Sequence, residues 1–136
     1  QLIADALLEL ETSRAIVLTS RDGMDEASIY TQTDIIEINA GKQSEYAIDP
    51  SEYGISGKDI NSIKTNDDKS SLDIIFSVIN NDESDAKEIC ILNAALSVML
   101  YKDIELGDAI NECRKSVEEY LVRDKFNQYV DYTNQV

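Results

Sequence analysis

Hydrophobic and polar positions follow three different patterns in the first third of the chain, and each pattern predicts a different element. Residues 2–11 place Leu, Ile and Ala at helical spacing, which predicts an amphipathic helix. Residues 15–18 are continuously apolar, which is typical of a strand with both faces covered. Residues 44–48 alternate polar and apolar, which predicts a strand with one face buried.

The alternating segment belongs to a predicted β-hairpin. Residues 27–30 predict a short strand, residues 34–39 predict a clearer one, and a turn at residues 40–42 leads into the alternating strand. One helical turn is expected next, with Asp49 as its cap, Pro50 at its first position and Gly54 at its end.

The second half of the chain is predicted to be helical. After an irregular segment at residues 55–69, anchored by Ile60 and Ile63, we expect one helix over residues 70–80 and a deeply buried one over residues 85–101. Asp103 is expected to cap a final long helix. The order of helix, buried strand, hairpin and three helices predicts an α/β fold.

The predicted sheet is incomplete. A strand covered on both faces needs parallel neighbours, which the chain barely supplies. The first helix also starts at Gln1 without a capping residue. We therefore expect the remaining strands to lie upstream of residue 1.

Length, charge and composition narrow the function. The 136 residues suffice for one domain, and 43% of them are hydrophobic, so a core can form. A net charge of −15 disfavours binding to nucleic acid or to an anionic membrane. No apolar run approaches the length of a membrane span. Cys90 and Cys113 lie on apolar helix faces and are interpreted as reduced core residues, which suits the cytoplasm.

The absence of histidine limits the chemistry further. Histidine is the commonest general base and a common ligand of transition metals, so a Ser-His-Asp site or a zinc site is not expected. No phosphate-binding glycine motif occurs in the chain. The chemistry must therefore depend on carboxylates, backbone amides and hard cations such as Mg²⁺.

The best candidate site is the segment that follows the buried strand, residues 21–26, which we call the acidic loop. It contains Asp22, Asp25 and Glu26, and Gly23 permits a tight turn. Ligands of open α/β sheets bind beyond the carboxyl ends of strands, and adjacent carboxylates suit Mg²⁺ that shares its other positions with water and phosphate. In so acidic a chain, composition alone favours a solvated surface turn.

Other polar residues are weaker candidates. Asn93 lies within the most apolar helix, where it is expected to hydrogen-bond a loop carbonyl or amide and secure packing. Asn66, Asp67 and Asp68 could bind a cation, but a helix cap or a solvated loop is the preferred interpretation. Tyr30, Tyr46 and Tyr53 are interpreted as ordinary hairpin and turn aromatics unless they meet a partner.

Several short blocks together carry a family resemblance. They are Arg14-Ala-Ile-Val-Leu, Asp22-Gly-Met-Asp-Glu-Ala-Ser, Tyr46-Ala-Ile-Asp-Pro, Tyr53-Gly, Leu92-Asn-Ala-Ala-Leu and Glu105-Leu-Gly. In this order and spacing they resemble the C-terminal part of anthranilate phosphoribosyltransferase, and the block around the acidic loop is the most specific. Residues 65–67 read Thr-Asn-Asp where that family often has Gly-Gly-Asp, and Ser71 replaces a common Asn.

The resemblance implies an activity and a metal site. In that family, anthranilate attacks the anomeric carbon of phosphoribosyl pyrophosphate and pyrophosphate leaves, a step of tryptophan biosynthesis. Asp25 and Glu26 match the acidic pair that helps to hold Mg²⁺. Asp22 is interpreted as a turn residue.

The resemblance also implies what surrounds this chain. Residues 1–136 would form the C-terminal portion of a three-layer α/β/α domain and would carry no catalytic residue of their own. The glycine-rich pyrophosphate loop, the anthranilate pocket and the helical region that forms a homodimer would lie upstream, so the fragment alone is expected to be inactive. Two alternatives stay open: a non-catalytic binding module, and a nucleoside phosphorylase-like transferase, for which no motif is present.

Overall fold

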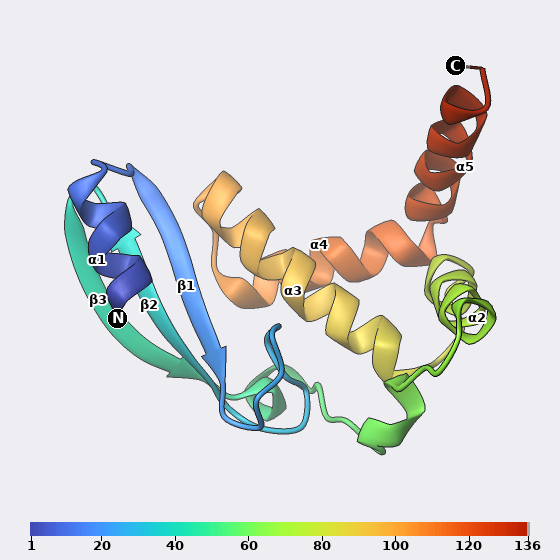
Figure 1. The fold of residues 1–136 in the computed structure, drawn as a ribbon, viewed down its shortest axis with the longest axis horizontal. Coiled ribbons are helices and arrows are strands. Elements are labelled where there is room, and N and C mark those ends of the chain that lie inside the picture. Colours follow the sequence, from blue (N-terminus) through green and yellow to red (C-terminus); the bar gives the residue numbers. More distant parts are fainter. Residues whose placement is uncertain (136) are drawn as a thin grey trace.

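Two hairpin-type connections and a long helical tail organise the chain. The computed structural model describes residues 1–135, and Figure 1 shows a small sheet beside a group of helices. The elements are α1 (Leu2–Glu9), β1 (Arg14–Ser20), β2 (Thr33–Asn39), β3 (Lys42–Ile48), α2 (Asp68–Ile79), α3 (Asp85–Lys102), α4 (Leu106–Glu118) and α5 (Leu121–Thr133), with 3₁₀ turns at Pro50–Tyr53 and Ile60–Ile63.

The sheet is antiparallel and has the order β1-β2-β3. Ala40 and Gly41 both have positive φ, at 49° and 76°, which suits the tight turn between β2 and β3. The hairpin is confirmed. Within the described residues, the apolar residues of β1 are half-buried and its neighbour β2 is antiparallel, so the parallel neighbours expected upstream of residue 1 stay a prediction.

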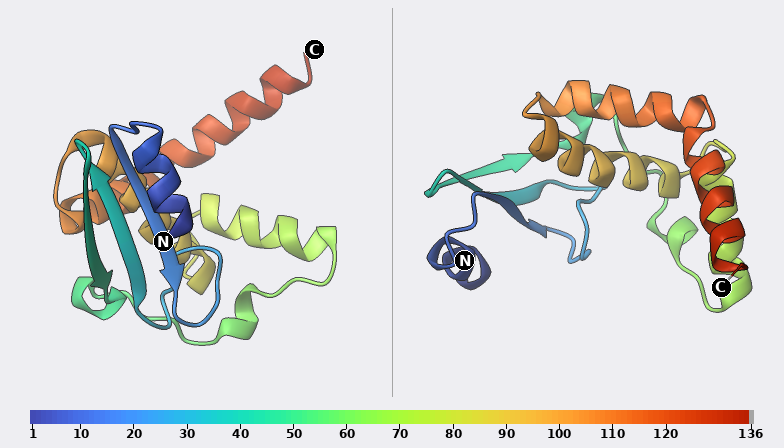
Figure 2. Two further views of the ribbon diagram at one scale, coloured as in Figure 1. Left: turned by 60° about the vertical axis from the view of Figure 1, so that its left-hand side comes forward. Right: turned by 90° about the horizontal axis from the view of Figure 1, so that it is seen from above.

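Helices lie on both faces of this sheet. Figure 2 shows α1 on one face and α3 with α4 on the other. Along β2, Ile35 joins the core cluster with α3, whereas the fully buried Ile38 lies outside that cluster. Because side chains alternate between faces along a strand, residues three apart point to opposite sides. The predicted α/β class and its layered arrangement are therefore confirmed.

The core forms between the sheet and the helices α3 and α4. Helix α3 supplies Ile91, Leu92, Ala95 and Leu96, all buried, whereas Cys90 and Ala94 are exposed, so the helix is buried on one face and not on most sides as its apolar pattern predicted. Burial of each such Leu or Ile stabilises the fold by about 1.5–3 kcal/mol. This core holds one face of α3 against the segment that follows β1.

The C-terminal helices differ from the prediction in two places. Asp103 does not cap a new helix: it ends α3 in a left-handed conformation, with φ of 57°. The predicted final helix is two helices, because Tyr120 adopts φ of 59° between α4 and α5. Asp and Asn tolerate this conformation better than other residues with side chains, so it suits Asp103 and is unusual for Tyr120.

Smaller predictions had mixed outcomes. The expected turn at Asp49 is confirmed, since its carboxylate accepts from the Ser51 amide and Gly54 has φ of 69°. Ile60 does not anchor its segment, because its side chain is exposed. Leu72, Ile75, Phe76 and Ile79 have the spacing of one face of α2, but only Ile79 is buried, and the exposed Phe76 contacts Phe126 of α5 edge to face.

No helix within residues 1–135 combines the length and the apolar composition needed to cross a membrane.

Candidate metal site in the acidic loop

The acidic loop starts as a turn that closes the end of β1. The Gly23 amide donates to the Ser20 carbonyl at 3.2 Å, and Gly23 has φ of 86°, a value that favours glycine. The Arg21 amide donates to the Gln32 carbonyl at 3.1 Å, which ties the turn to the start of β2. The loop therefore leaves the sheet along a defined path.

Asp22 stands at the centre of this turn. Its carboxylate accepts hydrogen bonds from the hydroxyls of Ser20 and Ser28, both at 2.6 Å, and from the Met24 amide at 3.1 Å. Burial opposes ionisation of Asp22, but these hydrogen bonds outweigh it and lower the pKa of its carboxyl. The interpretation of Asp22 as a turn residue agrees with these contacts.

Asn93 of α3 holds the other end of the loop. Its Oδ1 accepts from the Ala27 amide at 2.9 Å, and its Nδ2 donates to the Ala27 carbonyl at 2.9 Å and to the Ile89 carbonyl at 2.9 Å. The prediction that Asn93 hydrogen-bonds a loop amide or carbonyl is confirmed. Asn93 binds the amide and the carbonyl of Ala27 at the same time, which the sequence did not predict.

These contacts also explain why residues 27–30 do not form the predicted strand. Ala27, Ser28 and Ile29 are buried, as a strand would be, but three backbone amides of the segment donate to side chains. The Ala27 amide binds Asn93, the Ser28 amide donates to the Thr33 hydroxyl at 3.2 Å, and the Tyr30 amide donates to the Ser28 hydroxyl at 2.9 Å. These three amides are therefore satisfied without a partner strand.

Asp25 and Glu26 lie between the two held ends and are exposed. Within residues 1–135, neither carboxylate takes part in an ion pair, and no three His, Cys, Asp or Glu side chains gather as a complete metal-binding set. Mg²⁺ is usually held by one or two carboxylates, with waters and substrate phosphates in the other positions. Two exposed, unpaired carboxylates fit that donor set.

The cysteines give no competing site. The sequence predicted both cysteines to be core residues. In the structure Cys90 is exposed and Cys113 is half-buried. Partial burial of the Cys90 thiol, assisted by the charge of Glu26, raises its pKa. Burial also raises the pKa of Cys113. A raised pKa lowers the thiolate fraction, so neither thiol is activated as a nucleophile or a metal ligand.

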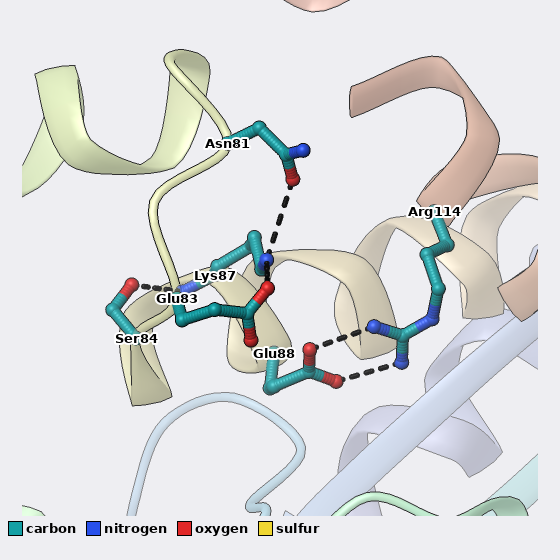
Figure 3. Close-up of polar contacts among 6 residues, drawn as sticks. All are labelled: Asn81, Glu83, Ser84, Lys87, Glu88 and Arg114. Carbon is teal, nitrogen blue, oxygen red and sulfur yellow. Dashed lines mark hydrogen bonds and ion pairs between the residues drawn. The ribbon is translucent and has the colours of Figure 1, made fainter. Parts of the chain in front are cut away.

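A second polar cluster surrounds the first turn of α3 (Figure 3). Lys87 is almost fully buried, and its Nζ binds the Asn81 amide oxygen at 3.3 Å and the Glu83 carboxylate. At the next position, the Glu88 carboxylate forms a bidentate ion pair with the Arg114 guanidinium of α4, with both hydrogen bonds at 2.8 Å. Every charge in this cluster has a partner, so its role is to join α3 to α4 and to the preceding loop.

Asp85, at the start of the same helix, organises the irregular segment. Its Oδ2 accepts from the amides of Lys58 and Asp59, both at 2.9 Å, and from the Tyr30 hydroxyl at 3.0 Å. Burial opposes ionisation of Asp85, but these hydrogen bonds lower its pKa. For Tyr30, burial first and the Asp85 carboxylate second raise the pKa to about 12. Tyr30 thus meets a partner, as does Tyr46, whose hydroxyl donates to the Glu37 carboxylate at 3.1 Å.

The alternative cation site at residues 66–68 is a helix cap. Asp67 precedes α2, and its carboxylate accepts from the Ser70 amide at 2.7 Å and from the Ser70 hydroxyl at 2.8 Å. This is the capping arrangement that the sequence favoured. The acidic loop is left as the candidate metal site.

Comparison with known proteins agrees with the motifs. The model of the glycosyl transferase family, a/b domain, matches residues 1–123. The chain is 32% identical over 131 residues to the anthranilate phosphoribosyltransferase of Hydrogenovibrio crunogenus and 30% identical to that of a Thermoanaerobacter species. These alignments cover 96% of this chain but only 38% and 39% of those proteins.

Solved structures show the same fold. Anthranilate phosphoribosyltransferase from Saccharomyces cerevisiae in complex with PRPP and Mg aligns with a TM-score of 0.85 at 15% identity, over 98% of this chain and 39% of that one. The enzyme from Thermus thermophilus aligns with a TM-score of 0.73 at 21% identity, over 91% of this chain and 37% of that one. The chain thus spans somewhat over a third of these proteins.

Proposed function

Since the chain belongs to the glycosyl transferase family, we propose that the protein that contains it is an anthranilate phosphoribosyltransferase and that this chain contributes the metal side of its active site. The substrates would be anthranilate and phosphoribosyl pyrophosphate. The bond from the anomeric carbon to the pyrophosphate oxygen breaks, a bond to the anthranilate nitrogen forms, and the amine loses a proton. The pathway served would be tryptophan biosynthesis.

The observation that carries this proposal is the exposed pair Asp25 and Glu26, held between two anchored residues at the end of a strand. Carboxylates placed there suit Mg²⁺ bound together with a pyrophosphate group. When bound, Mg²⁺ would neutralise negative charge that develops on the leaving pyrophosphate.

Charge explains why a metal is needed at this place. The chain carries 27 Asp and Glu against 12 Lys and Arg, so its field repels a polyanionic substrate. The Arg21 guanidinium next to the loop is engaged by Asp34 at 2.7 Å and does not supply a free cation. Asp25 and Glu26 can therefore attract pyrophosphate only through a bound cation.

Substrate positioning would come from outside these residues. We propose that the groups that bind the pyrophosphate backbone and anthranilate lie in the part of the relatives that this chain does not match, so residues 1–136 alone would show no turnover. A homodimer and a cytoplasmic location are further proposals, which rest on the family resemblance.

The test is a double variant of the intact protein, Asp25→Ala with Glu26→Ala. We expect turnover to fall by about 10²–10³-fold, because stabilisation of developing charge is lost, and the remaining activity to lose its Mg²⁺ dependence. The loss of anthranilate as it is consumed provides the measurement. The variant Glu118→Ala with Glu119→Ala removes the same two charges from exposed positions at the end of α4 and serves as the control.

The proposal fails if the intact protein does not transfer the phosphoribosyl group to anthranilate. The metal role fails if the Asp25 and Glu26 variant retains the kinetics of the control. An intact protein that is folded and inactive towards both substrates would instead support the binding module.

A further inference from the structure

The acidic loop is anchored on both sides of its two exposed carboxylates. Met24, which precedes Asp25, donates its amide to Asp22 at 3.1 Å. Ala27, which follows Glu26, is bound through both its amide and its carbonyl by Asn93. Only two residues separate these anchors, so the backbone of Asp25 and Glu26 has little freedom of its own.

Asn93 directs two of its three hydrogen bonds at a single loop residue, Ala27. One Nδ2 hydrogen satisfies the Ile89 carbonyl of its own helix, and the rest of the amide is directed at Ala27. Ala27 is fully buried, so water cannot replace these bonds. The helix that carries Asn93 is itself packed in the core, where the neighbouring residues Ile91 and Leu92 keep the anchor in place.

We propose that Asn93 is a positioning residue of the metal site: by binding the backbone directly after Glu26, it sets the direction in which the two carboxylates face a cation. This inference rests on the proposed function of Asp25 and Glu26 as metal ligands. Groups that orient metal ligands commonly change metal affinity or activity by about 10–100-fold when they are replaced. Asp22 performs the matching task on the side of Met24.

The test compares variants of the intact protein by metal binding as well as by activity. Asn93→Leu keeps the size of the side chain but removes both bonds to Ala27. Leu96→Ala, on the same buried helix, opens a cavity in the core and leaves those bonds intact. Mn²⁺ affinity is measured by titration in the presence of inorganic pyrophosphate, and hydrogen exchange is measured at the Ala27 amide.

We expect Asn93→Leu to weaken Mn²⁺ binding and to raise the Mg²⁺ concentration for half-maximal activity, each by about 10-fold or more, and to accelerate exchange at Ala27. Leu96→Ala should lower the melting temperature without changing the Mn²⁺ affinity. In the background of Asp25→Ala with Glu26→Ala, adding Asn93→Leu should not weaken Mn²⁺ binding further, because Asn93 acts through those ligands.

Three outcomes separate the inference from the proposed function. If Asn93→Leu accelerates exchange at Ala27 but leaves metal affinity unchanged, Asn93 has only a structural role and the inference is overturned. If the intact protein lacks transferase activity while Asn93→Leu still weakens Mn²⁺ binding, the inference stands and the proposed function fails. If the Asp25 and Glu26 variant binds Mn²⁺ as well as wild type, the inference fails together with the metal role proposed for Asp25 and Glu26.

A second variant guards against misfolding. Asn93→Ser is expected to bond the Ile89 carbonyl one turn earlier, so that this carbonyl and the new hydroxyl stay paired and only the Ala27 groups lose their partner. It removes the contacts with Ala27 as completely as Leu does. If Asn93→Leu does not fold, the same Mn²⁺ measurement on Asn93→Ser decides the question.

Discussion

Gly57 is the position at which the structure makes its sharpest stability prediction. A Cβ atom added there would lie 2.0 Å from Cε1 and 2.1 Å from Cδ1 of the Tyr30 ring. The Gly57 amide also donates to the Ile29 carbonyl at 2.9 Å, so the two segments cannot separate without losing this bond. In Gly57→Ala the Tyr30 ring must therefore move.

The cost of moving the ring follows from what holds it. Forcing an extra methyl group into a packed contact costs about 1–3 kcal/mol. If the ring swings away, its hydroxyl also loses the hydrogen bond to the Asp85 carboxylate at 3.0 Å, and a bond to a charged group contributes about 1.5–3 kcal/mol. We expect Gly57→Ala to destabilise the fold by about 3 kcal/mol, since a partial shift of the ring avoids part of each cost.

The decisive assay is a double-mutant cycle with Tyr30→Ala, measured by urea unfolding of the purified protein. Without the ring, the three atoms nearest to the added methyl group are gone. Gly57→Ala should then stabilise by about 0.4–1 kcal/mol, because alanine restricts the unfolded chain. Gly41→Ala is the control: its cost, about 1–2 kcal/mol, arises from a positive φ of 76° with no neighbour within 4 Å among the described residues and should not depend on Tyr30. An equal cost of Gly57→Ala in both backgrounds would refute the steric reasoning.

Two further predictions concern the dependence of stability on pH. The pKa of Tyr30 is raised to about 12 in the folded state, so its contribution to the free energy of unfolding is complete below pH ~10 and is lost as the pH rises towards 12. Tyr30→Phe should therefore flatten the decline of the urea midpoint at alkaline pH. The pKa of Asp22 is lowered in the folded state, so its contribution to the free energy of unfolding is present above pH ~4 and is lost as the pH falls through the lowered value. Asp22→Asn should therefore flatten the decline of the urea midpoint at acid pH. An unchanged slope of midpoint against pH would contradict the hydrogen bonds assigned to Asp22.

Local signals in the sequence predicted the elements whose causes are local. The hairpin, the turn capped by Asp49 and the cap of α2 by Asp67 each depend on residues within a few positions of one another. The break between α4 and α5 has no such signal. Val117 and Leu121 are four residues apart and continue the helical spacing, while the residue that turns the chain, Tyr120, is neither Gly nor Pro.

The apolar run of β1 shows a different limit. A continuous apolar run is typical of a strand covered on both faces, and the sequence alone could not say which elements cover it. In the structure β1 pairs antiparallel with β2, lies between α1 and α3, and keeps its apolar residues half-buried. The apolar run of β1 indicates that these residues favour burial. Which strands and helices pack against β1 depends on the topology of the rest of the chain.

The acidic loop has one feature with a local cause and one that depends on a distant segment. Asp25 and Glu26 are adjacent, so a short motif was enough to predict them as metal ligands, and that role stays a prediction. Their orientation depends on Asn93, which follows Ala27 by 66 residues and reaches it only because α3 packs against the sheet. A peptide of residues 14–28 would carry both carboxylates and the Asp22 turn, yet it would lack the anchor after Glu26. A motif can therefore supply the ligands of this site, but the packed helix α3 is required to hold them in place.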